Sequence, residues 1–509
     1  MTKTEDEKIV EAIYKKWRSR IFWAKVFNKK IVFYGASLFL EEFLKKYNIE
    51  SSAIAGIIDK NETRSGQKIC GYKIYTPDKI NNLNPDYMIF AIKNKNIRLY
   101  QEVSSNMKHL YPKIKLFPND FLKFEKFYGK LNKNVIHQLN NIISEIAPSK
   151  VVYLFQFSFF DKRGEKFFSG GGERYMLDLA DIIKNMGYTP ILLQSGDRKL
   201  DKTWVRKMNN LTIAGVNALG KNYYEIINNL NEPDLAIYSG IIKWKKNIKY
   251  KNNLIISHGI TWDIPRANAN INDLKSITET FDTMVSVDTS TISWFRSTFS
   301  HHLAMKKNKF EYVPNYVDTN KYVPINKNRD NIKITFPRRC SEERGVWLFA
   351  DVVPKLIQKF SNIEIEFVGF IHTKDVEEKI SELISKYPKN VSHRVVEQDK
   401  MYEVYQNTDI SVIPTLYSEG TSLSCLEAMA CGNTVIATNV GGLPNLIINN
   451  YNGKLINPDE ESLYNALTEV IENESLRKYL SQNAVSVANA FSKKDWETRW
   501  RNILSRYLV

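Results

Sequence analysis

Residues 409–438 read DISVIPTLYSEGTSLSCLEAMACGNTVIAT, in which an apolar run, a loop, a helix-forming run and a second apolar run follow one another. DISVIP and NTVIAT have the length and composition of buried strands, and the helical run between them begins near Ser422. Two parallel strands joined by a helix form a βαβ unit. We therefore predict an α/β fold whose functional residues lie in loops after strands.

Units of this kind recur along most of the chain. Strand-like and helix-like runs alternate from VVYLFQFSFF at 151–160 to EYVPN at 311–315, and again from IKITF at 332–336 to NTVIAT. The pattern predicts two α/β domains, at residues 150–320 and 321–490, each with a parallel sheet between helices. In such folds ligands bind beyond the carboxyl ends of strands, and two facing domains form a cleft.

A smaller α/β unit precedes these domains. Between residues 30 and 92, KIVFYG, SLFLEEFLKKY, AIAGIID and DYMIFAI alternate between strand-like and helix-like. Gly35 lies in the first turn and Asp59 ends the second strand, as in dinucleotide-binding folds, but two of the three glycines of G-x-G-x-x-G are absent. We predict a Rossmann-like accessory domain at residues 1–125 and a polar, helix-compatible linker at 126–149. NAD binding is an alternative that the missing glycines disfavour.

The N-terminal part of the chain is strongly basic. Residues 1–150 contain 27 Lys and Arg against 15 Asp and Glu, whereas the rest of the chain has a net charge of only +4. Within residues 8–30, apolar side chains recur at helical spacing among eight basic residues, at Ile9, Ile13, Trp17 and Ile21. This helix could lie on an anionic membrane surface or pack against its own domain. An acidic glycan is another candidate partner for the basic residues. Alternatively, these residues bind no partner and only keep the surface hydrated. We expect no nucleic acid partner.

Length and composition predict a globular protein of several domains. The 509 residues exceed what one hydrophobic core supports, and 43% apolar and 25% charged residues are ordinary values. The sequence has no run of 18 apolar residues and no start like a signal peptide, so we expect a cytoplasmic location, with peripheral contact at the inner face of the membrane as an option. The cysteines lack CxxC spacing, which indicates reduced thiols at Cys70, Cys340, Cys425 and Cys431.

The helix that begins near Ser422 is a candidate phosphate site. Gly420, Thr421 and Ser422 would expose unpaired backbone N–H groups at its N-terminus, and such groups bind phosphate. A carboxylate only accepts hydrogen bonds, so Glu419 beside this site would contact sugar hydroxyls. Glu427, further along the helix, could accept hydrogen bonds from the two hydroxyls of a ribose.

Cations for a diphosphate follow an earlier strand. In ITFPRRCSEERGV, Arg338, Arg339 and Arg344 provide guanidinium forks that bind phosphate oxygens bidentately. The chain contains no D-x-D sequence, so a metal held by paired aspartates is not suggested. Arginines and the helix dipole would then stabilise a leaving diphosphate without a metal or another cofactor.

The C-terminal half of the chain resembles retaining glycosyltransferase family 4, whose GT-B fold consists of two facing Rossmann-like domains. The resemblance rests on VPNYVDTNKYVP, on the R-x4-K-like spacing of Arg339 and Arg344, on the E-x7-E spacing of Glu419 and Glu427, and on EAMACGNTVIATNVGGLPNLI and YNGKLINP. Upstream, SGGGERYMLDLADIIKNMGYTP resembles the glycine-rich loop and first helix of that family, and ISHG resembles the strand end that bears its histidine. The likeness covers about residues 151–509. It implies that residues 491–509 form a helix that crosses back to the N-terminal domain of the pair.

This resemblance implies a role for each matching residue. Arg339 and Arg344 would bind the donor diphosphate, Glu419 the hydroxyls of the transferred sugar, and Glu427 the ribose of the nucleotide. His258 would lie near the donor sugar or the acceptor, and with Arg339, Arg344 and Glu419 it forms the predicted catalytic set.

The remaining predicted residues would bind the donor. Gly171 and Gly172 would form a loop that closes over the phosphates, and the start of the later helix would add Gly420, Thr421, Ser422 and Leu423. Arg344 departs from the family, which usually has lysine there. Thr421-Ser422 replace a common Phe-Gly, which leaves the identity of the donor open.

These observations predict a metal-independent glycosyltransferase of the hexosyltransferase type that retains the anomeric configuration. Its donor would be a nucleotide-diphosphate sugar such as a UDP- or GDP-sugar, and its acceptor a hydroxyl of a glycan, a lipid-linked molecule or a protein. The resemblance favours cell-surface polysaccharide or glycoconjugate biosynthesis. Two alternatives are a nucleotide-sugar epimerase of the same architecture and a non-catalytic nucleotide-sugar-binding scaffold.

Overall fold

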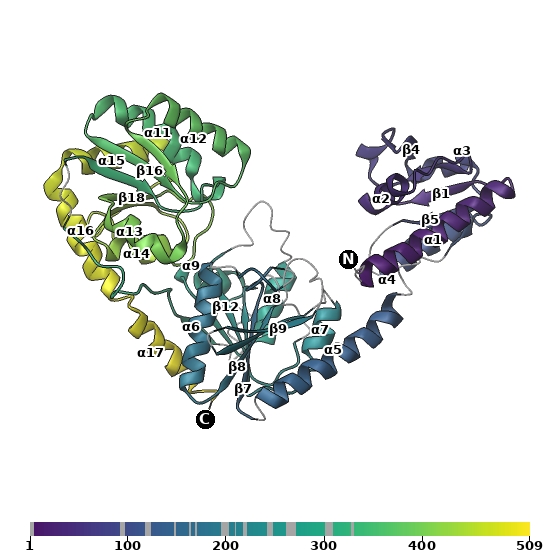
Figure 1. Cartoon of the computed structure of the whole chain (residues 1–509), viewed down its shortest axis with the longest axis horizontal. Coiled ribbons are helices and arrows are strands. Elements are labelled where there is room, and N and C mark those ends of the chain that lie inside the picture. Colours follow the sequence, from purple (N-terminus) through teal and green to yellow (C-terminus); the bar gives the residue numbers. More distant parts are fainter. Residues whose placement is uncertain are drawn as a thin grey trace. The chain divides into compact units, whose positions relative to one another are not determined.

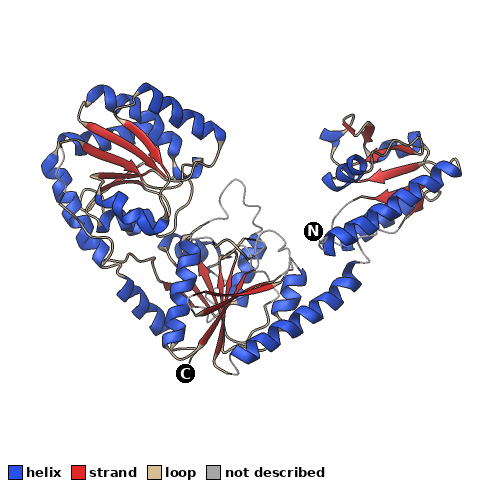
Figure 2. Cartoon of the chain, in the orientation of Figure 1, coloured by secondary structure: helices blue, strands red, loops and turns tan. Residues whose placement is uncertain are grey.

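The structure is a computed structural model, and it describes residues 5–91, 97–117, 124–146, 149–161, 164–167, 170–194, 203–208, 210–216, 221–241, 248–260, 271–300, 309–326 and 330–508. The chain forms two compact units, Met1–Asn134 and Val135–Val509. The first unit holds one sheet and the second holds two, with helices packed against each of them (Figures 1 and 2).

The sheet of the first unit has six strands in the order β3-β4-β2-β1-β5-β6, and all of its neighbouring pairs are parallel except β3 with β4. Its strands are β1 (Ile31–Tyr34), β2 (Ile54–Ile58), β3 (Lys68–Ile69), β4 (Tyr72–Tyr75), β5 (Tyr87–Phe90) and β6 (Lys115–Leu116). Its helices are α1 (Glu5–Val26), α2 (Leu38–Lys46), α3 (Ile80–Leu83) and α4 (Ile97–Leu110). A separate apolar cluster on each face of the sheet gives this small α/β unit a core of its own.

Helix α1 packs against this sheet with its apolar stripe. Ile13, Trp17 and Ile21 are buried, and the Trp17 ring contacts Phe33 of β1 and Phe43 of α2. The apolar stripe predicted from the sequence is therefore part of the core, so this face of α1 packs against its own domain rather than on a membrane. The side chain of Ile9 lies outside the described part of α1.

Asp59 holds the turn after β1. Its carboxylate accepts hydrogen bonds from the backbone N–H of Ala36 at 2.7 Å and of Asn61 at 2.9 Å, and the Arg64 guanidinium donates to the Ala36 carbonyl. The acid that would contact a ribose in a dinucleotide site thus binds the chain's own backbone, which explains why it is present without the glycines of such a site.

The N-terminal lobe of the second unit is an eight-stranded sheet in the order β14-β13-β12-β11-β7-β8-β10-β9, parallel except for β9 with β10. Its strands are β7 (Val151–Gln156), β8 (Thr189–Gln194), β9 (Trp204–Met208), β10 (Leu211–Gly215), β11 (Leu235–Ser239), β12 (Asn253–Ser257), β13 (Thr283–Ser286) and β14 (Lys309–Tyr312). Its helices are α6 (Gly171–Asn185), α7 (Lys221–Ile227), α8 (Ile271–Thr280) and α9 (Thr289–Thr298), together with the part of α5 (Phe124–Ile146) from Val135 onward.

The C-terminal lobe is a six-stranded parallel sheet in the order β17-β16-β15-β18-β19-β20. Its strands are β15 (Ile332–Phe336), β16 (Ile363–Val368), β17 (Val391–Arg394), β18 (Ile410–Ile413), β19 (Thr434–Thr438) and β20 (Lys454–Ile456). Its helices are α11 (Val346–Lys359), α12 (Lys374–Lys386), α13 (Met401–Gln406), α14 (Leu423–Ala430), α15 (Glu460–Glu472) and α16 (Glu474–Asn489). The predicted βαβ unit at 409–438 is β18, α14 and β19.

Two helices at the ends of this unit complete the N-terminal lobe. The segment at 126–149, expected as a linker, is mostly α5, and its Val135, Leu139 and Ile143 are buried in the core of the lobe because they recur every four residues. At the other end of the chain, α16 leads to α17 (Lys493–Leu504), which lies beside α6 (Figure 1). Trp500 of α17 donates its indole N–H to the Tyr175 hydroxyl at 2.9 Å.

Candidate active site between the two lobes

A cavity of about 750 Å³ lies between the two lobes of the second unit. The carboxyl ends of strands from both sheets and the first turns of α6 and α14 surround it. All the residues predicted for the site line this cavity, namely Gly171, Gly172, His258, Arg339, Arg344, Glu419, Gly420, Thr421, Ser422, Leu423 and Glu427. The structure thus brings the predicted set together, although several individual contacts differ from the predicted ones.

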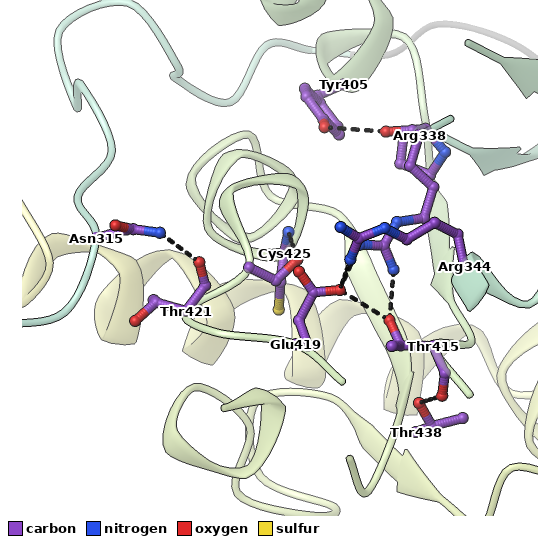
Figure 3. Close-up of polar contacts among 11 residues, drawn as sticks. Asn315, Arg338, Arg344, Tyr405, Thr415, Glu419, Thr421, Cys425 and Thr438 are labelled. Carbon is purple, nitrogen blue, oxygen red and sulfur yellow. Dashed lines mark hydrogen bonds and ion pairs between the residues drawn. The ribbon is translucent and has the colours of Figure 1, made fainter. Parts of the chain in front are cut away.

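Glu419 is the centre of a charged cluster on the C-terminal lobe (Figure 3). Its Oε2 atom accepts hydrogen bonds from Arg338 at 2.6 Å, from Arg344 at 2.5 Å and from the Thr415 hydroxyl at 2.9 Å. Burial raises the pKa of the Glu419 carboxyl, but the two guanidinium groups outweigh it, so the net pKa is below the ordinary value. Two cations around one carboxylate leave an excess of positive charge, which suits a bound anion.

Of the two neighbouring arginines Arg338 and Arg339, Arg338 is the buried one. Its side chain is 6% exposed, Nη1 donates to the Thr415 hydroxyl at 2.7 Å, and burial lowers its pKa. Arg339 is exposed and lines the same cavity. The spacing from Arg344 had favoured Arg339 as its partner, whereas the structure pairs Arg344 with Arg338 around Glu419. Spacing alone does not show which of two neighbouring residues after a strand points inward.

The N-terminus of α14 is capped and bridged to the other lobe. Ser422 is the N-cap, with its hydroxyl accepting from the backbone N–H of Cys425, and the helix begins at the next residue. The Thr421 hydroxyl donates to the Val287 carbonyl of the N-terminal lobe, and Asn315 Nδ2 donates to the Thr421 carbonyl at 2.6 Å. The two residues that replace Phe-Gly therefore serve as a bridge between lobes and as a helix cap.

Three glycine-containing turns meet at the base of the cavity. A methyl group added at Gly420 would lie 2.6 Å from the His258 carbonyl oxygen, and one at Gly259 would lie 2.8 Å from the Gly420 nitrogen. One at Gly442 would lie 2.5 Å from the Gly420 carbonyl oxygen. These close backbone approaches join the loop after β12 to the loop that carries Glu419.

The glycines of SGGGER form the start of α6 rather than a separate loop. Gly170 is the N-cap and α6 begins at Gly171. A methyl group at Gly171 would lie 2.8 Å from Leu423 Cδ1, so the first turn of α6 directly faces the first turn of α14. Two helix N-termini therefore meet at the cavity, and both favour a negatively charged ligand.

Glu427 lies at the inner end of the cavity and is 2% exposed. Its Oε1 atom is 3.4 Å from Arg174 Nη2 on α6, and Tyr322 and Tyr405 are near enough to lower the pKa of the carboxyl. Burial raises the pKa of Glu427, and these three neighbours offset the increase only in part. The residue predicted to contact a ribose thus contacts side chains of its own chain in this structure.

Arg174, Tyr322 and Tyr405 were not predicted as part of the site. Arg174 lies in the first turn of α6, three residues after Gly171, so its position beside the glycine run was a usable signal. The two tyrosines come from the segment before β15 and from α13, and nothing in their spacing relates them to Glu427.

His258 follows β12 and faces the cavity as a neutral imidazole. Its Nε2 atom is 2.9 Å from the Ser239 hydroxyl at the end of β11, and the Tyr175 ring packs edge-on against it. Burial lowers the pKa of His258 to about 4. At neutral pH the ring can therefore exchange hydrogen bonds with a hydroxyl group but adds no positive charge.

Within the part of the chain that the structure describes, no three His, Cys, Asp or Glu side chains gather closely enough to hold a metal ion. No helix among the described residues is long and apolar enough to cross a membrane. The four cysteines are free thiols, of which Cys70 is exposed.

Comparison with known proteins gives a match for the C-terminal lobe. Residues 318–487 match the model of the family described as glycosyl transferases group 1. The matched segment covers most of the C-terminal lobe, which is therefore similar to this family. It contains Arg338, Arg344, Glu419 and the whole of α14. In the first unit, residues 27–110 match a family described as C2185-like, N-terminal.

Curated proteins that are similar to part of this chain come from archaea and bacteria. An uncharacterized glycosyltransferase of Methanocaldococcus jannaschii is 26% identical over 35% of this chain and 45% of its own length. The lipopolysaccharide 1,2-N-acetylglucosaminetransferase of Salmonella typhimurium is 24% identical over 36% of this chain and 49% of its own length. The chain thus matches less than half the length of these relatives.

Solved structures show that the fold of the second unit is GT-B. Sucrose-phosphate synthase from Thermosynechococcus elongatus superposes with a TM-score of 0.56 at 16% identity, over 70% of this chain and 98% of its own. HepE of Anabaena, in a complex with UDP, superposes with a TM-score of 0.55 at 16% identity, over 70% of this chain and 100% of its own. Two facing Rossmann-like domains preceded by a small α/β domain were predicted, and this architecture is confirmed.

Proposed function

We propose that this protein is a glycosyltransferase that moves a sugar from a nucleotide-diphosphate sugar to a hydroxyl of a glycan, a lipid-linked molecule or a protein. The observation that carries this proposal is the cluster of Arg338 and Arg344 around Glu419, inside the cavity between the lobes. Guanidinium groups and helix N-termini are the groups that bind phosphate in proteins. The group 1 domain and the UDP complex of HepE, which has the same fold, agree with this choice.

The contacts suggest how a donor would bind. The diphosphate would lie between Arg344 and the first turn of α14, with Arg338 behind it as a buried cation. The bonds that Glu419 makes to Arg338, Arg344 and Thr415 all end on Oε2, so Oε1 is left to accept a sugar hydroxyl. The ribose would exchange hydrogen bonds with Glu427, in place of its contact with Arg174.

The main catalytic contribution would be electrostatic. The bond between the anomeric carbon and a diphosphate oxygen breaks, the acceptor oxygen bonds to that carbon, and the acceptor proton passes to the diphosphate. Arg338, Arg344 and the helix N-termini would stabilise the charge that develops on the diphosphate, so we propose that no metal is needed. We also propose that the acceptor attacks on the face from which the diphosphate leaves, which retains the configuration. A Glu419 carboxylate held by two guanidinium groups is a poor general base for an inverting step and a poor nucleophile for a double displacement.

A panel of UDP-, GDP- and other nucleotide-sugars tests this function. We expect one donor to raise the melting temperature and to be hydrolysed slowly without an acceptor, with activity that persists in EDTA. NMR of the product should show the same anomeric configuration as the donor. Conversion of the donor to an epimer would indicate the epimerase instead, and binding without any turnover would indicate the scaffold. Absence of both binding and turnover with every donor would contradict the proposal.

We further propose that the product belongs to a cell-surface polysaccharide or another glycoconjugate. The Salmonella typhimurium relative acts on lipopolysaccharide according to its name, and the predicted acceptors include lipid-linked glycans. An acceptor of this kind would place the enzyme at the inner face of the membrane. Activity on extracted lipid-linked glycans, compared with free monosaccharides, tests this assignment.

A further inference from the structure

Helix α1 has a second apolar face that its own domain does not cover. Phe22, Trp23, Val26 and Phe27 are 59%, 51%, 55% and 65% exposed. Val26 and Phe27 follow Phe22 and Trp23 by one helical turn, so the four side chains share one face, which ends one residue past the helix. The Trp23 ring stacks on Phe27 at 5.7 Å and meets Phe22 edge-on at 5.3 Å. These four residues are called the aromatic ridge below.

The aromatic ridge is unusual for a surface that faces only water. Exposed apolar side chains that occur singly are normal, whereas a contiguous group marks an interaction site. Trp23 contacts both other rings of the group, and it is the only tryptophan among the described residues that is exposed as a large apolar side chain. The stripe Ile13, Trp17 and Ile21 already anchors the helix to its domain, so the ridge is not needed for that packing.

Positive charge surrounds the aromatic ridge. From Ala12 to Leu40 the sequence has seven Lys and Arg and no Asp or Glu. A groove of about 510 Å³ begins at Phe22 and is lined by Lys15, Arg18, Ser19, Lys25 and the segment 48–51, in which Glu50 is the only carboxylate. The first unit as a whole has 26 Lys and Arg against 14 Asp and Glu.

We propose that the aromatic ridge and the adjoining basic groove dock this protein on the surface of a membrane that contains anionic phospholipids. Tryptophan and phenylalanine rings are favoured at the boundary between headgroups and acyl chains, and lysine and arginine near them attract anionic headgroups. The groove offers three cationic side chains and a serine hydroxyl to a headgroup phosphate beside the inserted rings. The docking face is therefore the exposed face of α1, and not the buried stripe that first suggested a membrane helix.

This docking goes beyond the transferase reaction, because it needs none of the residues between the two lobes. It would place a cytoplasmic enzyme beside lipid-linked acceptors. The two proposals can fail separately, since vesicle binding requires no donor and no turnover.

Vesicle flotation of the full chain tests the proposal. We expect binding to vesicles of phosphatidylcholine with about one-third phosphatidylglycerol, and much weaker binding to phosphatidylcholine alone, because electrostatic attraction and ring insertion act together. The triple variant F22S/W23S/F27S should lower the partition coefficient at least tenfold. K15E/K25E should lower the partition coefficient for anionic vesicles by as much, and should leave that for phosphatidylcholine vesicles unchanged. The matched controls L38S/L110S and K60E/K108E change exposed residues of the same kinds elsewhere in the first unit and should bind like wild type.

A second measurement reports insertion directly. Brominated lipids should quench part of the tryptophan fluorescence of the wild type, and that part should disappear in W23F, which keeps an apolar ring in place. Equal vesicle binding by wild type and the triple variant would overturn the proposal. A triple variant that melts at a lower temperature with unchanged vesicle binding would also overturn it, because the ridge would then pack against another part of the protein. Loss of self-association, without any vesicle binding by the wild type, would assign the ridge to a second copy of the chain instead.

Discussion

Arg174 of α6 and Glu427 of α14 form an ion pair of 3.4 Å that joins the two lobes across the cavity. The Glu427 carboxylate is almost fully buried, whereas the arginine is about one-third exposed. A buried carboxylate that loses its cation is destabilised, so this contact favours the arrangement in which the lobes are close together. Because a donor ribose would contact the same carboxylate, Arg174 links the state of the site to the contact between the lobes.

The first prediction concerns this ion pair. Arg174→Met should lower the free energy of unfolding by about 1–2 kcal/mol, because it leaves a buried carboxylate without its cation. A double-mutant cycle with Glu427→Gln, measured by urea unfolding, should give a coupling energy near 1 kcal/mol or more. The same cycle on the exposed pair Lys355 and Glu460 is the control, where about 0.5 kcal/mol or less is expected. Equal coupling in both pairs would contradict the account.

The second prediction compares the two neighbouring arginines. Arg338→Gln should lower turnover at least about a hundredfold, because it removes a buried cation from the site where negative charge develops. It should also destabilise the fold, since Glu419 loses one of its partners. Arg339→Gln is the matched control, and it should change turnover less than about tenfold because that side chain is exposed. Kinetics at saturating donor, on protein shown to be folded, check the difference, and a larger loss in the Arg339 variant would reverse the assignment.

The third prediction is a pH dependence from His258. Burial lowers its pKa to about 4 in the folded protein, whereas the ordinary value in an unfolded chain is about 6.5. The unfolded state therefore binds more protons between these values, and stability falls as the pH drops from about 6.5 towards 4, by about 3 kcal/mol. Urea unfolding at a series of pH values should show a shallower decline for His258→Gln. Parallel curves for the two proteins would show that this histidine does not titrate as described.

The fourth prediction concerns the C-terminal helix. Trp496 and Trp500 are buried against α6, and Trp500 bonds to the Tyr175 hydroxyl. A chain that ends before Trp496 should melt at a clearly lower temperature, because it exposes the apolar surface that these rings cover. Trp500→Phe is a milder variant that keeps most of the packing, and its loss should be about 1 kcal/mol from the missing hydrogen bond. An unchanged melting temperature of the truncated chain would contradict this role of α17.

Much of the fold could be predicted from the sequence because parallel sheets produce regular apolar runs. The stretch from 409 to 438 forms β18, α14 and β19 close to the expected positions, and Ser422, near which the helix was expected to begin, is its N-cap. The segment at 126–149 was harder, since its polar composition suggests a linker while Val135, Leu139 and Ile143 recur at helical spacing. The recurrence, and not the composition, determines its packing.

The position of the site could be predicted from the sequence, but the contacts among its side chains could not. Residues from both lobes converge because they follow strands of parallel sheets, and Glu419 and Glu427 lie before and after the start of α14. Which of Arg338 and Arg339 points inward depends on the exit direction of a single loop, and the neighbours of Glu427 come from three distant segments. Such contacts are tertiary, so no local pattern encodes them.

The sequence alone also could not separate the buried face of α1 from its exposed face. Its buried stripe was visible as Ile13, Trp17 and Ile21, but the exposed face with Trp23 and Phe27 overlaps it in sequence. Only the packing of the domain separates the residues that fill the core from those that are left at the surface.

We propose that the cavity between the lobes binds a diphosphate through Arg338, Arg344 and the start of α14. Calorimetric titration with nucleoside diphosphates and the matching monophosphates tests it most directly. The preferred diphosphate should bind at least about tenfold more tightly than its monophosphate. Arg344→Gln should abolish this difference, and Arg344→Lys should keep part of it because the charge remains. A preference for the diphosphate that is unchanged in Arg344→Gln, or no preference in the wild type, would contradict it.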